Sequence, residues 1–188
     1  MFRPLVIFDI EATCDPKLPK HKREIIEIGA VKILNGEIIG TFQCFVKPRK
    51  NNILTDYCKT LTHIEQSNID NAKSPKDALT DFFEWANDSV LASWGEFDND
   101  IVNRELHKTK LEKQFNFSFV NMKRVYLAIF KLPTKYSLID CLRRERIKFD
   151  GEQHRAYNDA YNTYQLYKKR QKAIDEMLIN FYPKSYFI

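Results

Sequence analysis

Long apolar runs are absent from this sequence. The longest, such as Leu5–Phe8, fall far short of the roughly 20 residues that cross a bilayer. An acidic pair interrupts the first apolar stretch almost at once, which is not the pattern of a secretory signal peptide. Repeats, linkers and low-complexity segments are absent as well. We therefore expect one globular domain over 1–188, with no membrane association.

Cysteine is scarce, and no two cysteines have the C-x-x-C spacing of a zinc or redox motif. Disulfide frameworks belong mainly to small secreted domains. The four scattered residues, Cys14, Cys44, Cys58 and Cys141, are therefore expected to be reduced thiols in a cytoplasmic protein. Cys14 follows an acidic motif closely, although packing of a small side chain is the simpler explanation of its place.

The net charge of +5 and the pI near 8.9 make the chain mildly basic, which suits a polyanionic partner. The positive charge is concentrated in two runs. One lies beside the first acidic motif and contains Lys17, Lys20, His21, Lys22 and Arg23; the other contains Lys168, Lys169, Arg170 and Lys172. A solvated loop and a solvated helix face explain these two runs equally well.

Three strands are expected near the N-terminus. Leu5–Ile10 is apolar and β-branched, as a buried strand would be. Glu24–Leu34 and Glu37–Val46 follow, joined at Asn35-Gly36, the strongest short hairpin signal. We expect these first three strands to form the antiparallel part of a sheet.

The rest of the chain alternates helices and strands. Residues 47–60 are polar and irregular, whereas Ser74 and Pro75 suit the N-cap and first position of a helix. Strands are expected at 89–94 and 119–122, and further helices at 98–109, 124–130, 137–145 and from 155 to beyond 173. This order predicts an α/β fold, a mixed five-stranded sheet flanked by helices.

Asp9 and Glu11 lie two residues apart at the end of the first strand, so their side chains share one face. Their carboxylates are the hard oxygen ligands that Mg²⁺ and Mn²⁺ prefer. On its own, such a pair is more often two exposed acids at a strand end. Asp98 follows another strand at the start of a helix, where α/β folds place their sites. An N-cap role is the alternative, and Asp100 competes for the same duty.

His154 precedes the last helix, and Asp159 lies in its first turns. This spacing lets the aspartate face the strand carboxylates while the histidine lies at the edge of the site. A histidine there can take a proton from water that divalent ions have made acidic. Alone, His154 is more often a surface or capping residue. The five side chains together predict a metal site for phosphodiester cleavage.

The motifs FDIEAT, SWGEFD and HRAYNDA, in this order, resemble those of the DEDDh 3′-to-5′ exonucleases, which have a ribonuclease-H-like fold. Within that group the chain is most similar to the enhancer-of-RNA-interference type, the exoribonucleases related to the histone-mRNA-degrading enzyme. The resemblance covers about residues 3–170. The aromatic tail 175–188 lies outside it and is expected to pack on the domain.

The resemblance implies a two-metal phosphodiesterase in which Asp9, Glu11, Asp98 and Asp159 hold two Mg²⁺ or Mn²⁺ ions. It also implies that His154 is the general base and that nucleoside 5′-monophosphates leave one at a time from single-stranded 3′ ends. Many eukaryotic members carry an added nucleic-acid-binding module, for which 188 residues leave no room. Specificity for histone mRNA is therefore not carried over.

Substrate contacts are expected from residues around these acids. Ala12 and Thr13 follow the first pair directly, and Trp94 and Phe97 are aromatic residues that can stack on a base. Glu27 is a further candidate, for the terminal sugar. Burial at a strand end is the stronger alternative for Trp94.

RNA is the favoured substrate, with DNA, in proofreading or end trimming, as the nearest alternative, because contacts to the 2′-hydroxyl decide between them and no sequence pattern fixes those. A catalytically silent nucleic-acid-binding module on the same fold is the alternative from another class. All five motif positions are filled here, which favours the enzyme.

Overall fold

A computed structural model describes residues 3–115 and 117–181. Its centre is a five-stranded sheet in the order β3-β2-β1-β4-β5. The strands are β1 (Leu5–Ala12), β2 (Ile25–Leu34), β3 (Glu37–Phe45), β4 (Val90–Ser93) and β5 (Phe119–Asn121). The pairs β1–β2 and β2–β3 are antiparallel, whereas β4 pairs with β1 and with β5 in parallel. The mixed sheet predicted from the sequence is confirmed.

The hairpin between β2 and β3 turns at the predicted dipeptide. Asn35 and Gly36 both have left-handed backbones, with φ of 53° and 82°. Two consecutive positive φ values define the tight turn that matches the twist of paired strands. The turn sets the register that brings β2 beside β1, with Asp9 opposite Gly29 and Glu11 opposite Glu27.

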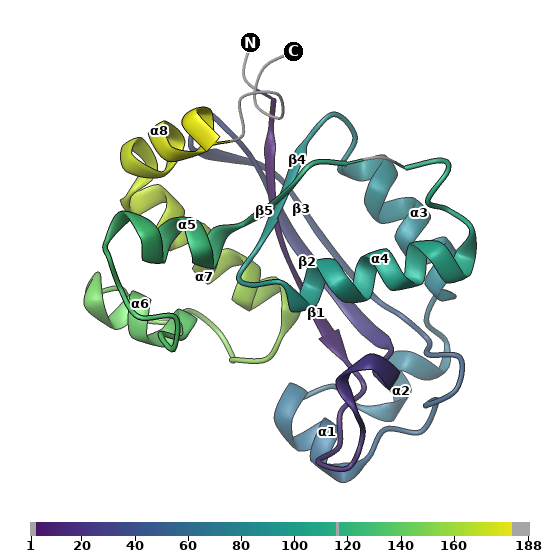
Figure 1. Ribbon diagram of the computed structural model, residues 1–188. Coiled ribbons are helices and arrows are strands. Elements are labelled where there is room, and N and C mark those ends of the chain that lie inside the picture. The colour runs from purple at the N-terminus through teal and green to yellow at the C-terminus, as the bar shows by residue number, and fades with distance from the viewer. Residues whose placement is uncertain (1–2, 116, 182–188) are drawn as a thin grey trace.

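Helices cover both faces of the sheet (Figure 1). None of the described helices is both long and apolar enough to cross a membrane. The helices are η1, a 3₁₀ turn (Lys20–Lys22), α1 (Asp56–Thr62), α2 (Gln66–Asp70), α3 (Pro75–Trp85), α4 (Phe97–Thr109), α5 (Met122–Ile129), α6 (Leu138–Arg144), α7 (Ala156–Lys169) and α8 (Gln171–Phe181).

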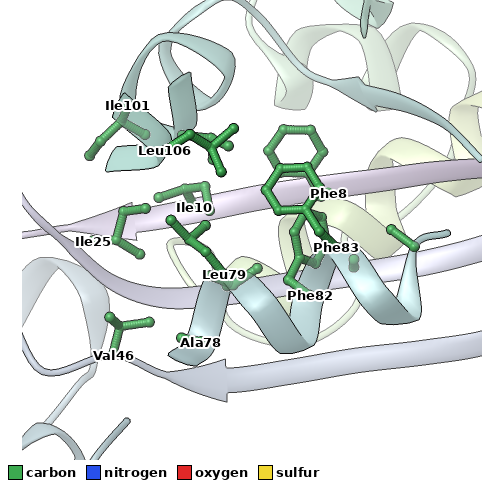
Figure 2. Packing of buried hydrophobic residues seen from close by; sticks show 14 of the residues in the cluster. Phe8, Ile10, Ile25, Val46, Ala78, Leu79, Phe82, Phe83, Ile101 and Leu106 are labelled. Atoms are coloured by element: carbon green, nitrogen blue, oxygen red, sulfur yellow. The ribbon is translucent and has the colours of Figure 1, made fainter. Parts of the chain in front are cut away.

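Each face of the sheet has its own core because side chains alternate along β1. Phe8 and Ile10 point to the face that α3 and α4 cover, where they pack with Leu79 and Phe82 (Figure 2). The opposite face belongs to α5, α7 and α8, and there Ile7 joins a second buried cluster. The side chains of Asp9 and Glu11 lie on the same face of β1 as Ile7, the face that α7 covers.

Two expectations about the helices are wrong. The segment 47–60, expected to be irregular, ends in the start of α1, which α2 follows. Both helices are too short to show a period, and local caps hold them: Thr55 Oγ1 accepts from the Cys58 amide at 3.1 Å. The long helix expected beyond residue 155 is two helices that meet at Arg170, whose side chain pairs with Glu145 at 2.6 Å.

The aromatic tail was expected to pack on the domain. Its first part belongs to α8, where Leu178 is fully buried in the core. Residues 182–188 lie outside the described residues.

Gly29 lets α7 approach the sheet closely. A Cβ on Gly29 would lie 2.0 Å from the backbone nitrogen of Tyr157. We expect Gly29→Ala to lower the free energy of unfolding by about 3 kcal/mol or more, because rigid backbone must move to admit the methyl group. Gly40→Ala is the control, since its nearest neighbour would be the Trp85 ring at 3.6 Å. Urea unfolding of both variants measures this, and equal stabilities would contradict the close approach.

Candidate active site

Three carboxylates meet where β1 ends under α7. Asp9 and Glu11 come from β1, and Asp159 comes from the first turn of α7. Each residue has a carboxylate oxygen within 4.8 Å of one from each of the other two. The absence of a side chain at Gly29 permits this meeting, since α7 starts directly against β2.

Asp98 joins the cluster from α4 on the other side of β1. Its side chain is 6% exposed, and its Oδ1 accepts a hydrogen bond from the Ile10 amide at 3.2 Å. It lines the same pocket as the other three acids. Asp100 is exposed and does not line this pocket. Of the two candidates on α4, Asp98 is therefore the one that lies at the site.

His154 lies at the rim of the pocket, immediately before α7. Its backbone is left-handed with φ of 60°, and its amide donates to Asp159 Oδ2 at 2.8 Å. The side chain is exposed and lines the pocket together with the four acids. The placement expected from the sequence, a histidine at the edge of the carboxylate cluster, is what the structure has.

Burial raises the pKa values of all four acids. Burial, followed by the charges of the other acids, raises the pKa of Asp9 and of Glu11 well above the usual range. Burial raises the pKa of Asp98 to about 6, against the hydrogen bonds from Ser93 and Ile10, and that of Asp159 to about 7. Partial burial and the nearby His63 lower the pKa of His154.

This donor set fits divalent cations. Four carboxylates in one small pocket are hard oxygen ligands, and the energetic cost of ionising them together is what bound cations would relieve. Any ions here would be held by Asp9, Glu11, Asp98 and Asp159. The site can then bind an anionic group, such as a phosphate, through those cations.

Metal should stabilise the protein in a pH-dependent way. Raised carboxyl pKa values contribute stability that is present below pH 4 and lost as pH rises through 6 to 7, where Asp98 and Asp159 ionise. The protein in EDTA therefore loses a few kcal/mol from these groups over that window. Mn²⁺ should raise the Tm clearly at pH 7.5 and little at pH 4.5. The Tm difference between Mn²⁺ and EDTA, measured at each pH, cancels all other titrations; an equal difference at both pH values would contradict the metal site.

The pocket has a volume of about 330 Å³ and contains three of the five residues expected to touch substrate. Ala12, Trp94 and Phe97 line it. Trp94 is partly buried, and its Nε1 is enclosed without a hydrogen-bond partner among the described residues. The aromatic pair therefore borders the space in which a base would lie.

Thr13 and Glu27 do not line the pocket and have structural partners instead. Thr13 Oγ1 accepts from the Glu24 amide at 3.0 Å. Glu27 is fully buried and accepts from the Ala156 amide at 3.1 Å, while its ion pair with Arg155 measures 2.9 Å. Glu27 thus fixes the start of α7, and with it His154 and Asp159.

Ile10, Arg23 and Leu61 also line the pocket, and none of them was singled out as a site residue from the sequence. Leu61 comes from α1, a helix that the sequence pattern does not show. Arg23 belongs to the basic run beside the first motif, and only the fold places it in the pocket. Cys14 lines the pocket as well, which is one of the two explanations considered for it.

Comparison with known proteins agrees with this geometry. The Exonuclease family model (RNase_T) matches residues 6–167. Human ERI1 exoribonuclease 2 is 28% identical, over 87% of this chain and 28% of the human protein. The PolC-type DNA polymerase III of Oceanobacillus iheyensis is 31% identical, over 93% of this chain and 12% of the polymerase.

A solved structure is similar over almost its whole length. It is the nuclease domain of 3′hExo, a DEDDh family member, bound to rAMP, with a TM-score of 0.83 and 27% identity over 91% of this chain and 92% of that domain. The chain spans less than a third of each of the two relatives above. The match over residues 6–167 shows that the chain belongs to the RNase_T exonuclease family, and its likeness within that family is to the DEDDh 3′-to-5′ exonucleases of the ERI1 type.

Proposed function

We propose that this protein is a metal-dependent 3′-to-5′ exonuclease that removes nucleoside 5′-monophosphates from single-stranded RNA. The observation that carries the proposal is the meeting of four carboxylates and one histidine, from three separate segments, in one pocket. Family membership alone leaves the state of the site open, since a fold does not fix a function. Here every side chain that the chemistry needs lies at the pocket.

Asp9, Glu11, Asp98 and Asp159 are proposed to hold two divalent ions, Mg²⁺ or Mn²⁺. When bound, such a pair of ions lowers the pKa of water and stabilises charge on both the attacking and the leaving oxygen. The hydrogen bond from Ile10 keeps Asp98 turned toward the end of β1. Asp159 is oriented by the His154 amide at 2.8 Å.

His154 is proposed as the general base. Its ring is exposed at the rim, where the proton of an attacking water can be taken and passed to solvent. The hydrogen bond from its own amide to Asp159 limits how far the residue can move from the carboxylates. Proton removal by His154 would accompany attack on the last phosphodiester, and the 3′ oxygen of the shortened strand would leave.

The pocket suits a single unpaired nucleotide. Its volume of about 330 Å³ is small, near the lower limit of about 300 Å³ for small-ligand sites. Trp94 and Phe97 offer ring faces for a base, a contact that tolerates any sequence. RNA is favoured because the human relative is named an exoribonuclease and the similar nuclease domain was solved with rAMP. The similarity to a DNA polymerase keeps DNA as the second candidate.

Matched oligonucleotides test the proposal. Single-stranded RNA and DNA of one sequence, labelled at the 5′ end, should be offered with Mg²⁺ or Mn²⁺ and with a free or phosphorylated 3′ end. We expect a ladder that shortens from the 3′ end, faster on RNA and only with a free 3′-hydroxyl. A faster ladder on DNA would favour the second candidate, and internal cuts would contradict an exonuclease.

A further inference from the structure

A basic groove lies close to the acidic pocket. It has a volume of about 650 Å³, and its lining includes four cationic side chains, Lys22, Arg49, Lys50 and Lys108. Lys22 is the last residue of η1, Arg49 and Lys50 come from the segment after β3, and Lys108 comes from α4. All four are exposed. The basic run noted in the sequence thus becomes one side of a groove whose other cations come from distant segments.

The groove is linked to the acidic pocket by shared lining residues. A small hollow of about 260 Å³ lies between them, and it shares Cys14 with the acidic pocket and both Leu18 and Asn51 with the groove. Arg23 in the pocket is the chain neighbour of Lys22 in the groove. A strand with its 3′ end among the carboxylates therefore has a lined path onward.

A buried carboxylate holds the loop that carries two of the cations. Glu24 is 6% exposed and accepts hydrogen bonds from the amides of Arg49, Lys50 and Asn51 at 3.1, 3.0 and 2.8 Å. The Asn51 side chain adds another at 3.0 Å. These hydrogen bonds satisfy the Glu24 carboxylate within the protein. They also fix Arg49 and Lys50 beside Lys22.

The groove keeps an excess of positive charge after its internal pairs are counted. Glu105 is almost fully buried and pairs with Arg49 at 2.5 Å and with Lys108 at 2.6 Å. Lys22 and Lys50 form no ion pair within residues 3–115 and 117–181. Two solvated lysines on a fixed scaffold are free to neutralise phosphates.

Arg23 is a cation in the acidic pocket itself. Its Nε is buried and has no hydrogen-bond partner in the described part of the chain, while its backbone oxygen accepts from Arg104 at 2.7 Å. A guanidinium donates well to phosphate oxygens, which are the groups that would reach this position together with a 3′ end.

We propose that the groove binds the phosphodiester backbone of the strand upstream of its 3′ end, with Arg23 at the phosphate nearest the pocket and Lys22 and Lys50 at phosphates farther along. This inference rests on the proposed function. It assigns the first basic run, and not the second run at Lys168–Lys172, to the substrate.

Charge reversal tests the assignment. In an Asp9→Asn background, which keeps RNA intact, Lys22→Glu with Lys50→Glu should weaken binding of a fluorescent 20-nucleotide RNA about tenfold or more. The slope of log affinity against log salt should fall by about 1.4, as expected for two lost phosphate contacts. The matched control is Lys169→Glu with Lys172→Glu, the same charge change at two exposed lysines of the other run, and it should change affinity less than twofold. Circular dichroism and Tm confirm that both variants fold.

Substrate length gives a second test. In the active enzyme, the groove variant should raise KM for the 20-nucleotide RNA far more than for a dinucleotide with a 5′-phosphate, whereas Arg23→Ala should raise KM for both. Equal effects of the two lysine pairs, or a groove effect independent of length, would overturn the inference. A wild-type protein that binds RNA through the groove yet releases no nucleotide would contradict the proposed function and leave this inference standing.

Discussion

Replacing Asp9 by asparagine is expected to lower nucleotide release by about 10³-fold or more and to leave the fold intact. Two bound ions would supply several kcal/mol of transition-state stabilisation, and each 1.4 kcal/mol is a factor of ten in rate. Asp9 lies beside Asp98, Asp159, Glu11 and Glu27, whose charges all raise its pKa.

The same substitution should not destabilise the metal-free protein. Asparagine has nearly the same shape and removes one charge from a cluster in which every neighbour is repulsive. We therefore expect Asp9→Asn to unfold in EDTA at the same temperature as the wild type or higher, and to lose the Tm increase that Mn²⁺ gives. The control is Asp100→Asn, two residues from Asp98 but exposed and outside the pocket, which should keep its activity. Activity of Asp9→Asn within tenfold of the wild type would refute the site assignment.

His154→Asn is expected to lower kcat by about 10²- to 10⁴-fold, the usual contribution of a general base. Asparagine is the suitable substitution because the backbone at this position has φ of 60°, a conformation that asparagine tolerates better than alanine. The amide that donates to Asp159 is kept, so the carboxylates should stay in place. Loss of the ring then reports on proton transfer alone.

The metal affinity of the His154→Asn variant distinguishes a general base from a metal ligand at this position. Mn²⁺ titration by calorimetry should give His154→Asn the same dissociation constant as the wild type within about threefold. His107→Asn is the control for the chemistry of the substitution, since its side chain is 85% exposed on α4 and lies outside the pocket. A collapse of Mn²⁺ affinity in His154→Asn would make the histidine a metal ligand instead.

The sheet could be predicted because its signals are local. The signals are the apolar, β-branched run of β1, the Asn35-Gly36 turn and the Ser74-Pro75 start of α3, and each depends on neighbours in the chain. The carboxylates could be predicted for a related reason: they lie at strand ends and helix starts, where a parallel pair such as β1 and β4 brings distant residues to one edge. The family resemblance then placed Asp98 ahead of Asp100.

The remaining features depend on contacts between distant segments. Helices α1 and α2 are too short to show a hydrophobic periodicity in the sequence. The position of Leu61 in the pocket could therefore not be predicted. Glu27 has the chemistry of a ligand, yet its ion pair with Arg155, which lies 128 residues away, gives it a structural role. Nothing in the sequence around Gly29 indicates that α7 packs against this residue.

Incorporation of ¹⁸O from water tests the account most directly, because it follows the bond that the pocket is said to break. Single-stranded RNA should be degraded with Mg²⁺ in H₂¹⁸O, and the released mononucleotides analysed by mass spectrometry. We expect nucleoside 5′-monophosphates with one ¹⁸O in the phosphate and a shortened strand whose 3′-hydroxyl carries no label. Nucleoside 2′,3′-cyclic or 3′-monophosphates, or label at the 3′ oxygen of the strand, would contradict attack by water at phosphorus with the 3′ oxygen as leaving group.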